Sequence, residues 1–186
     1  LTSLRTLYQR EYQQLPFSKD RQQHILNAIL IKSYMKAIDE TVTLTSEEER
    51  VLHDYLFSVE IWGHYELLFF SSCSPLLSIQ LFTKYTREML RKSDFLQGVG
   101  NNRNMMHTLL LNAFMACIEI DDFTNALYFK KQIEKNFFEE NETYFRIVYL
   151  WAEGLLDSKQ GRAEEGQRKM EDAIRIFEMI GCRTSA

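Results

Sequence analysis

Two pairs of predicted helices in the second half of the chain repeat one another after about forty residues. The matched positions are apolar or small: 109–111 with 149–151, Ala126 with Gly166, Ile133 with Ala173, and Phe137 with Phe177. Small residues such as Ala126 and Gly166 are typical of places where two helices of a hairpin approach closely. A period of about forty residues lies in the range of solenoids built from helical hairpins. The repeat therefore predicts stacked helix pairs.

Helix signals continue upstream of the repeat, although without a fixed step. The chain has only 7 Gly and 2 Pro, which indicates long helices with short connections. We predict an all-α, TPR-like right-handed superhelix of about nine helices in one domain, residues 1–186. An irregular helical bundle is the alternative. The predicted helices are 1–14, 18–38, 46–59, 60–71, 76–90, 103–120, 123–137, 141–158 and 162–180, with a turn at 71–75 and a loop at 93–101.

Capping residues mark several predicted helix ends. Ser18 is a candidate N-cap, and both Thr45 with Glu48 and Ser46 with Glu49 fit the capping-box pattern. Farther along, Asn141 is a candidate N-cap and Gly161 a candidate helix end.

The net charge of −4 argues against direct binding to nucleic acid, because phosphate recognition needs clustered Lys and Arg. The most basic run, 87–92, is interrupted by acidic and apolar residues. No apolar run is long enough to span a bilayer, and the chain does not open on a signal-peptide pattern. The three widely spaced cysteines fit a reducing compartment. We therefore expect a cytoplasmic protein without membrane contact.

The sequence carries no pattern typical of catalysis. No two of the four histidines are spaced as a metal-binding pair, and no serine occupies a nucleophile elbow. The glycine-containing segment 98–103 lacks the third glycine of a dinucleotide loop and follows a helix instead of a strand. We expect a protein that is not an enzyme and that uses no metal or cofactor.

Polar side chains in the predicted helix 103–120 are the best candidates for ligand binding. An Asn side chain can both donate to and accept from a peptide unit, and Arg can hold a carboxylate through two hydrogen bonds. This helix offers Arg103, Asn104 and His107, followed by Asn112 inside an otherwise apolar run. Asn112 either lines a groove or bridges two helices, because a buried amide must find partners.

Aromatic residues on the predicted first helices of neighbouring pairs are further candidates. These are Trp62, Tyr65, Tyr144 and Trp151. Rings at helical spacing serve either as core or as a binding platform, and the polar ends of Tyr and Trp suit both uses. We expect them, with the four polar residues, to contact a peptide.

Three stretches resemble the regulatory domain of the Rgg/GadR/MutR transcriptional regulators of Gram-positive bacteria. They are residues 55–66 (YLFSVEIWGHYE), Leu110-Leu111-Asn112, and the closing run 177–181 (FEMIG). The resemblance implies a cytoplasmic homodimer whose TPR-like domain receives a short peptide pheromone. DNA binding would belong to an N-terminal helix-turn-helix that this chain lacks. Arg103, Asn104 and Asn112 are the positions to which the resemblance assigns peptide contacts.

Two functions remain open from the sequence. The first is a peptide-sensing domain that controls DNA binding. The second is a constitutive interaction and dimerisation scaffold without a small ligand. In either case we expect Ile174, Phe177 and Ile180, on the last predicted helix, to form a two-fold contact, because two-fold dimers are the commonest oligomers.

Overall fold

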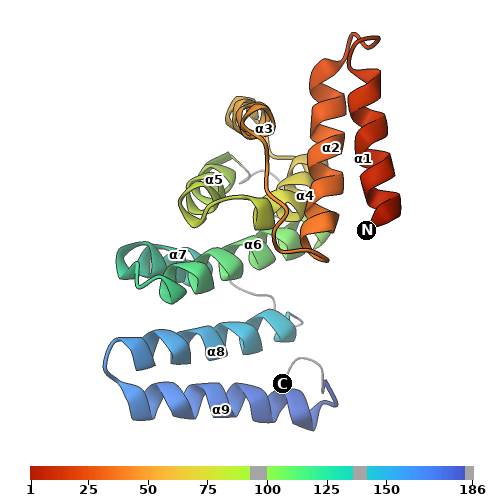
Figure 1. Cartoon of the computed structure of the whole chain (residues 1–186). Helices are drawn as coiled ribbons and strands as arrows, with labels where there is room; N and C mark the ends of the chain where they lie inside the picture. The colour runs from red at the N-terminus through yellow and green to blue at the C-terminus, as the bar shows by residue number, and fades with distance from the viewer. Residues whose placement is uncertain (93–99, 136–141, 183–186) are drawn as a thin grey trace. The chain divides into compact units, whose positions relative to one another are not determined.

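The computed structural model describes residues 1–92, 100–135 and 142–182, and all regular structure in these ranges is helical (Figure 1). Within these ranges, the prediction of an all-α fold with about nine helices is confirmed. The elements are α1 (Thr2–Gln14), α2 (Arg21–Lys36), α3 (Ser46–Ser58), α4 (His64–Cys73), the 3₁₀ turn η1 (Ser74–Leu76), α5 (Ile79–Lys92), α6 (Gly100–Glu119), α7 (Phe123–Lys135), α8 (Thr143–Lys159) and α9 (Ala163–Met179).

The chain divides into two compact units, residues 1–105 and 106–186. Unit 1 contains α1 to α5 and the first turn of α6. Unit 2 contains the rest of α6 and the helices α7 to α9. The single domain predicted over 1–186 stays a prediction.

Unit 1 has a core of aromatic rings around Phe70 of α4. The Phe70 ring centroid lies 5.2 Å from that of Trp62, 5.7 Å from that of Phe82 and 6.2 Å from that of Tyr85. All four side chains are buried. Edge-to-face and tilted contacts of this kind add about 0.5–1.5 kcal/mol per pair beyond the burial of apolar area. The core therefore joins α4 to α5 and to the loop before α4.

A buried carboxylate, that of Glu48, joins the first three helices. Its Oε2 accepts from Lys32 Nζ (2.6 Å) and from the Thr45 backbone N–H (2.7 Å). Its Oε1 accepts from the hydroxyls of Tyr8 (2.9 Å) and Tyr12 (3.0 Å). Burial opposes ionisation, but Lys32, the Thr45 N–H and Tyr8 outweigh it and hold the pKa of Glu48 below its usual range. The capping box thus uses Thr45 and Glu48, the first of the two predicted pairs.

The forty-residue repeat reappears in two helix-ending turns of unit 2. Asp121 follows α6 with φ 59°, and Gly161 follows α8 with φ 87°. In both turns the next backbone N–H donates to the carbonyl five positions earlier, at 2.9 Å. This is the Schellman geometry, in which a residue in the left-handed region satisfies the last carbonyls of a helix. Gly161 therefore ends α8, as predicted.

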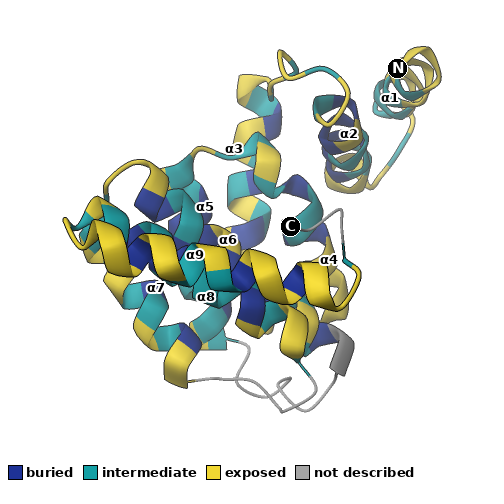
Figure 2. Ribbon diagram, turned by 90° about the horizontal axis from the view of Figure 1, so that it is seen from below, coloured by how far each residue is buried: buried dark blue, intermediate teal, exposed yellow. Residues whose placement is uncertain are grey.

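Helices α8 and α9 lie side by side (Figure 1), and their backbones meet at Gly154 and Gly166. A Cβ atom at Gly166 would lie 2.2 Å from Ser158 Oγ and 2.4 Å from the Gly154 carbonyl oxygen. The close approach predicted at Gly166 is confirmed. Figure 2 shows α9 as a mostly exposed helix, and it buries only Gly166, Ala173 and Phe177.

Some predicted helix boundaries were wrong in unit 1. The N-cap of α2 is Asp20, whose N–H donates to Ser18 Oγ at 3.0 Å, so the predicted cap Ser18 stabilises the preceding turn. Helix α4 begins at His64, four residues later than predicted, and extends into the predicted turn, ending at Cys73. Ile38 lies beyond the end of α2 and is exposed. Asn141, Phe137 and most of the predicted loop, 93–99, lie outside the described residues.

We predict that Glu48→Ala lowers the free energy of unfolding by about 3–5 kcal/mol, because it leaves the buried ammonium of Lys32 without its carboxylate. Urea unfolding at pH 7 measures the loss. The matched control is Glu47→Ala, one residue away, whose carboxylate pairs with Arg21 at the surface. That variant should lose less than about 1 kcal/mol. Equal losses in the two variants would contradict the role given to Glu48.

We also predict that Gly166→Ala destabilises the α8–α9 pair by about 1–3 kcal/mol, because the new methyl group forces the two backbones apart. Thermal and urea unfolding report the change. Glu165→Ala, at the adjacent exposed position of α9, should change stability by less than about 0.5 kcal/mol. An unchanged stability in Gly166→Ala would show that the hairpin does not depend on this approach.

Candidate functional site

Asn112 is the exposed member of a run of buried residues in α6. Its neighbours Leu109, Leu110, Leu111, Ala113 and Phe114 are each 3% exposed or less, whereas Asn112 faces solvent. A helix that is apolar around most of its circumference is packed on most of its sides. The single open side of α6 at this level thus presents an amide with two donor hydrogens and an acceptor oxygen. Asn112 is not sealed between helices, which was the alternative to lining a groove.

The same side of α6 carries further polar residues. Asn104, Thr108 and Asn112 follow one another at steps of four and therefore lie on one side of the helix. Asn104 is exposed and Thr108 half-buried, and Arg103 next to them is also half-buried. We call Asn104, Thr108 and Asn112 the α6 polar stripe. Thr108 was not among the predicted contacts, although its step of four from Asn104 places it on the same side of the helix.

The structure gives His107 a structural role instead of the predicted contact with a ligand. Its side chain is buried, its Nε2 lies 3.4 Å from Glu142 Oε2, and its ring packs against Phe145 with centroids 5.3 Å apart. Glu142 is the N-cap residue of α8. The imidazole therefore links α6 to the start of α8 inside unit 2.

Trp62 is corrected as well. It lies in the loop before α4, not on a helix, and its indole is completely buried against Phe70. Tyr65, the second residue of α4, is about half exposed and stacks on Phe69 with ring centroids 6.2 Å apart. The exposed Leu68 lies one turn farther along α4 and was not identified from the sequence. Of the two predicted aromatic residues in unit 1, only Tyr65 presents a ring to solvent.

A polar contact inside unit 1 joins the beginnings of α4 and α6. His64 Nδ1 lies 2.8 Å from Asn102 Oδ1, and Asn102 is buried. The first turn of α4 carries Tyr65, and the first turn of α6 carries Arg103 and Asn104. The contact therefore brings one aromatic and two polar candidates to neighbouring helix ends.

In unit 2, Tyr144 and Trp151 of α8 differ in exposure. Tyr144 is more than half exposed, and its ring centroid lies 5.8 Å from that of Phe177. Trp151 is half-buried and packs against the core cluster of Ile147, Ala173 and Phe177. Tyr144 is thus the more accessible of the two predicted contacts, and Trp151 serves mainly as core.

The three residues predicted to form a dimer contact also differ in their exposure to solvent. Phe177 is buried in the core of unit 2, so it is corrected to a packing residue. Ile174 and Ile180 are exposed. Ile176 and Met179, which were not predicted, are exposed too. Met179 and Ile180 lie three and four positions after Ile176, so the three side chains are on the same side of the helix. We call Ile176, Met179 and Ile180 the α9 apolar patch.

The shifted pKa of Tyr149 in unit 2 is explained by burial and by neighbouring carboxylates. Burial, followed by the carboxylates of Glu153 and Glu134, raises the pKa of Tyr149, whose hydroxyl donates to Glu134 at 2.9 Å. No three His, Cys, Asp or Glu side chains in the described ranges are placed to hold a metal ion. No helix within them combines the length and the apolar character needed to cross a bilayer.

Solved structures of two kinds share this fold. A variant of the Streptococcus dysgalactiae SHP pheromone receptor Rgg2 is 27% identical, with a TM-score of 0.80 over 98% of this chain and 68% of that one. A second Rgg2 crystal structure gives 26% identity and a TM-score of 0.73, over 96% and 72%. A putative transcriptional regulator from Listeria monocytogenes EGD-e, 17% identical, matches 98% of this chain and 63% of that one with a TM-score of 0.78, which shows the fold alone.

The family model described as "HTH-type transcriptional regulator Rgg, C-terminal domain" matches residues 6–186. The resemblance seen in the sequence is thereby confirmed, and the family consists of regulators, not enzymes. This chain belongs to the family of Rgg C-terminal regulatory domains.

Proposed function

We propose that this chain is the peptide-sensing and dimerising domain of a cytoplasmic transcriptional regulator. A short peptide binds at the α6 polar stripe and controls DNA binding through a helix-turn-helix head outside this chain. The exposure of Asn112 within a buried helix is the observation that carries the proposal. The Rgg2 structures, which are described as SHP pheromone receptors, support the class of ligand.

The chemistry of the stripe suits an extended peptide. A peptide that docks on a helix loses water from its backbone N–H and C=O groups, and these groups need replacement partners. The amides of Asn104 and Asn112 offer both donors and acceptors, so they can pair with a peptide unit in either orientation. Arg103 would hold a carboxylate of the ligand. Tyr65 in unit 1 and Tyr144 in unit 2 are each candidates for contact with apolar side chains, because each presents a ring to solvent.

Regulation requires that the peptide bind two states of the protein unequally. A ligand with equal affinity for both states shifts no equilibrium, however tightly it binds. A coupling of about 1–3 kcal/mol, which is typical of allosteric proteins, would change DNA affinity by about 5- to 150-fold. We propose that repacking of neighbouring helix pairs transmits this coupling to the DNA-binding head.

We predict that Asn112→Ala weakens the binding of a cognate short hydrophobic peptide, encoded by the same organism, about three- to tenfold, because one amide contact is lost. Arg103→Ala should weaken it more, by about ten- to a hundredfold, because a charge-assisted contact is lost. Isothermal titration calorimetry of the wild type and both variants measures these changes. Lys131→Ala, at an exposed position of α7, is the control and should bind as the wild type does.

Unaltered affinity in both Asn112→Ala and Arg103→Ala, with the peptide bound, would remove the stripe as the peptide site. Circular dichroism should show both variants folded, since Asn112 is exposed and Arg103 half-buried.

A constitutive dimerisation scaffold is the second candidate, and the α9 apolar patch favours it. Exposed apolar residues at steps of three and four form a stripe that a second copy of the helix can cover. A two-fold axis would place the same patch of both protomers in contact. The burial of Trp62 and His107 also fits this candidate, because two predicted ligand contacts are used inside the protein.

We predict that Ile180→Glu raises the dimer dissociation constant more than about tenfold, because a charge would be buried in an apolar contact. Sedimentation equilibrium measures it. Ile38→Glu, at an isoleucine that is similarly exposed in unit 1, is the control and should leave the dimer unchanged. A dimer that is insensitive to Ile180→Glu would place the interface elsewhere. Tight dimerisation without any peptide binding would favour the scaffold.

A further inference from the structure

The first turn of α6 carries two of the proposed peptide contacts and has little helical preference of its own. It reads Gly100-Asn101-Asn102-Arg103-Asn104. Glycine and asparagine are weaker helix formers than most residues. No acidic side chain stands in this turn to complement the partial positive charge of the helix N-terminus. Arg103 and Asn104 therefore lie in a turn whose order depends on contacts with the rest of unit 1.

One such contact is the hydrogen bond between His64 and Asn102. His64 Nδ1 lies 2.8 Å from Asn102 Oδ1. An amide oxygen can only accept, so the imidazole Nδ1 donates. Asn102 is 2% exposed, and a buried acceptor that loses its donor is penalised more than an acceptor that water can reach. The contact therefore holds the residue next to Arg103 in place.

The start of α4, which supplies His64, is itself fixed in unit 1. Gly63 is the N-cap residue of α4, and its N–H donates to Glu66 Oε2 at 3.0 Å. The preceding residue, Trp62, is completely buried in the aromatic core. Because both sides of His64 are held in this way, α4 provides a rigid base from which the imidazole reaches α6.

We propose that His64 is a positioning residue for the peptide site. Its hydrogen bond to Asn102 keeps the first turn of α6 in the helical form in which Arg103 and Asn104 contact the ligand. When only a fraction of the molecules hold this turn, the apparent affinity for the ligand falls by that fraction. The inference rests on the peptide site proposed above, and His64 acts through Asn102 without touching the peptide.

Amide hydrogen exchange of the full chain, followed by NMR without any peptide, tests the hold on α6. His64→Leu removes the donor, and it should fold because His64 is exposed. The amide hydrogens of Asn104 and Met105, among the first to bond within α6, should exchange about five- to tenfold faster than in the wild type. Those of Leu110 and Leu111, in the middle of the same helix, should keep their rates.

His64→Asn is the rescue variant. The amide nitrogen of an asparagine is as far along the side chain from Cβ as Nδ1 is in histidine, so it can donate to the same oxygen of Asn102. Exchange at the start of α6 should return to within about twofold of the wild-type rates. A loss of local packing alone would not be reversed by this change, because leucine fills more space than asparagine.

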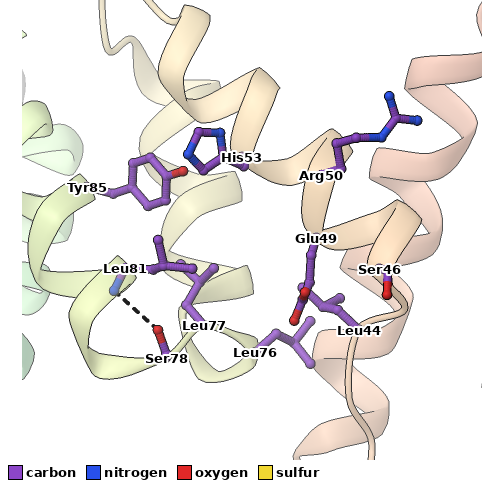
Figure 3. Close-up of a pocket in the computed structure, with 10 residues that line it drawn as sticks. All are labelled: Leu44, Ser46, Glu49, Arg50, His53, Leu76, Leu77, Ser78, Leu81 and Tyr85. Atoms are coloured by element: carbon purple, nitrogen blue, oxygen red, sulfur yellow. Dashed lines mark hydrogen bonds between the residues drawn. The ribbon is translucent and has the colours of Figure 1, made fainter.

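The control is His53→Leu, the same substitution at another histidine of unit 1. Figure 3 shows His53 near Tyr85, at a pocket lined by α3, by Leu44 before it and by the segment from η1 into α5. The rings of His53 and Tyr85 meet edge-on with centroids 6.0 Å apart. No described residue of α6 lines this pocket, so His53→Leu should leave exchange at Asn104 and Met105 unchanged.

Calorimetry with the short hydrophobic peptide used for Asn112→Ala then measures the effect on the ligand. His64→Leu should bind this peptide about three- to tenfold more weakly than the wild type does, because fewer molecules hold the turn. His64→Asn and His53→Leu should bind it within about twofold of the wild-type affinity.

Equal exchange rates at Asn104 and Met105 in the wild type and His64→Leu would overturn the proposal. Exchange in His64→Asn as fast as in His64→Leu would also overturn it, because a restored donor would then have no effect. Faster exchange with unchanged peptide affinity would remove His64 from the peptide site. A wild type that binds no peptide would instead overturn the proposed function, and the exchange rates would still decide whether His64 holds α6.

Discussion

The packing of α6 on most of its sides is the constraint on which the interpretation of this protein depends. Leu109, Leu110, Leu111, Ala113 and Phe114 bury their side chains almost completely. A polar residue within such a run has either to be paired inside the protein or to face the one open side. Asn112 faces that side, whereas His107 is paired inside with Glu142. The same helix thus carries one candidate binding residue, Asn112, and one structural residue, His107.

The helix packing of each unit depends on one local contact that a single substitution would disrupt. In unit 1 the carboxylate of Glu48, on α3, accepts from donors on α1 and α2 and from the α3 N-cap residue Thr45, so the three helices share one buried charge. In unit 2 the missing side chains of Gly154 and Gly166 let two backbones touch. The glycine contact also fixes α8, which presents Tyr144.

The α6 polar stripe offers neutral amides that suit a peptide backbone. Membership of the Rgg family establishes the class of regulator. The assignment of ligands to particular residues depends on the geometry of exposed and unpaired groups.

The sequence by itself determined the helical class, the forty-residue repeat, the helix end at Gly161 and the close approach at Gly166. It left two candidate capping boxes, and the structure selected Thr45 with Glu48. These features depend on residues near one another in the chain or on a periodic pattern. The tertiary structure decided that Trp62 and Phe177 are core residues and that Asn112 is exposed. It also brought Leu44 and Glu49 to Leu77 and Tyr85 across the pocket. Burial depends on which neighbouring helix covers a side chain, and spacing along one helix does not contain that information.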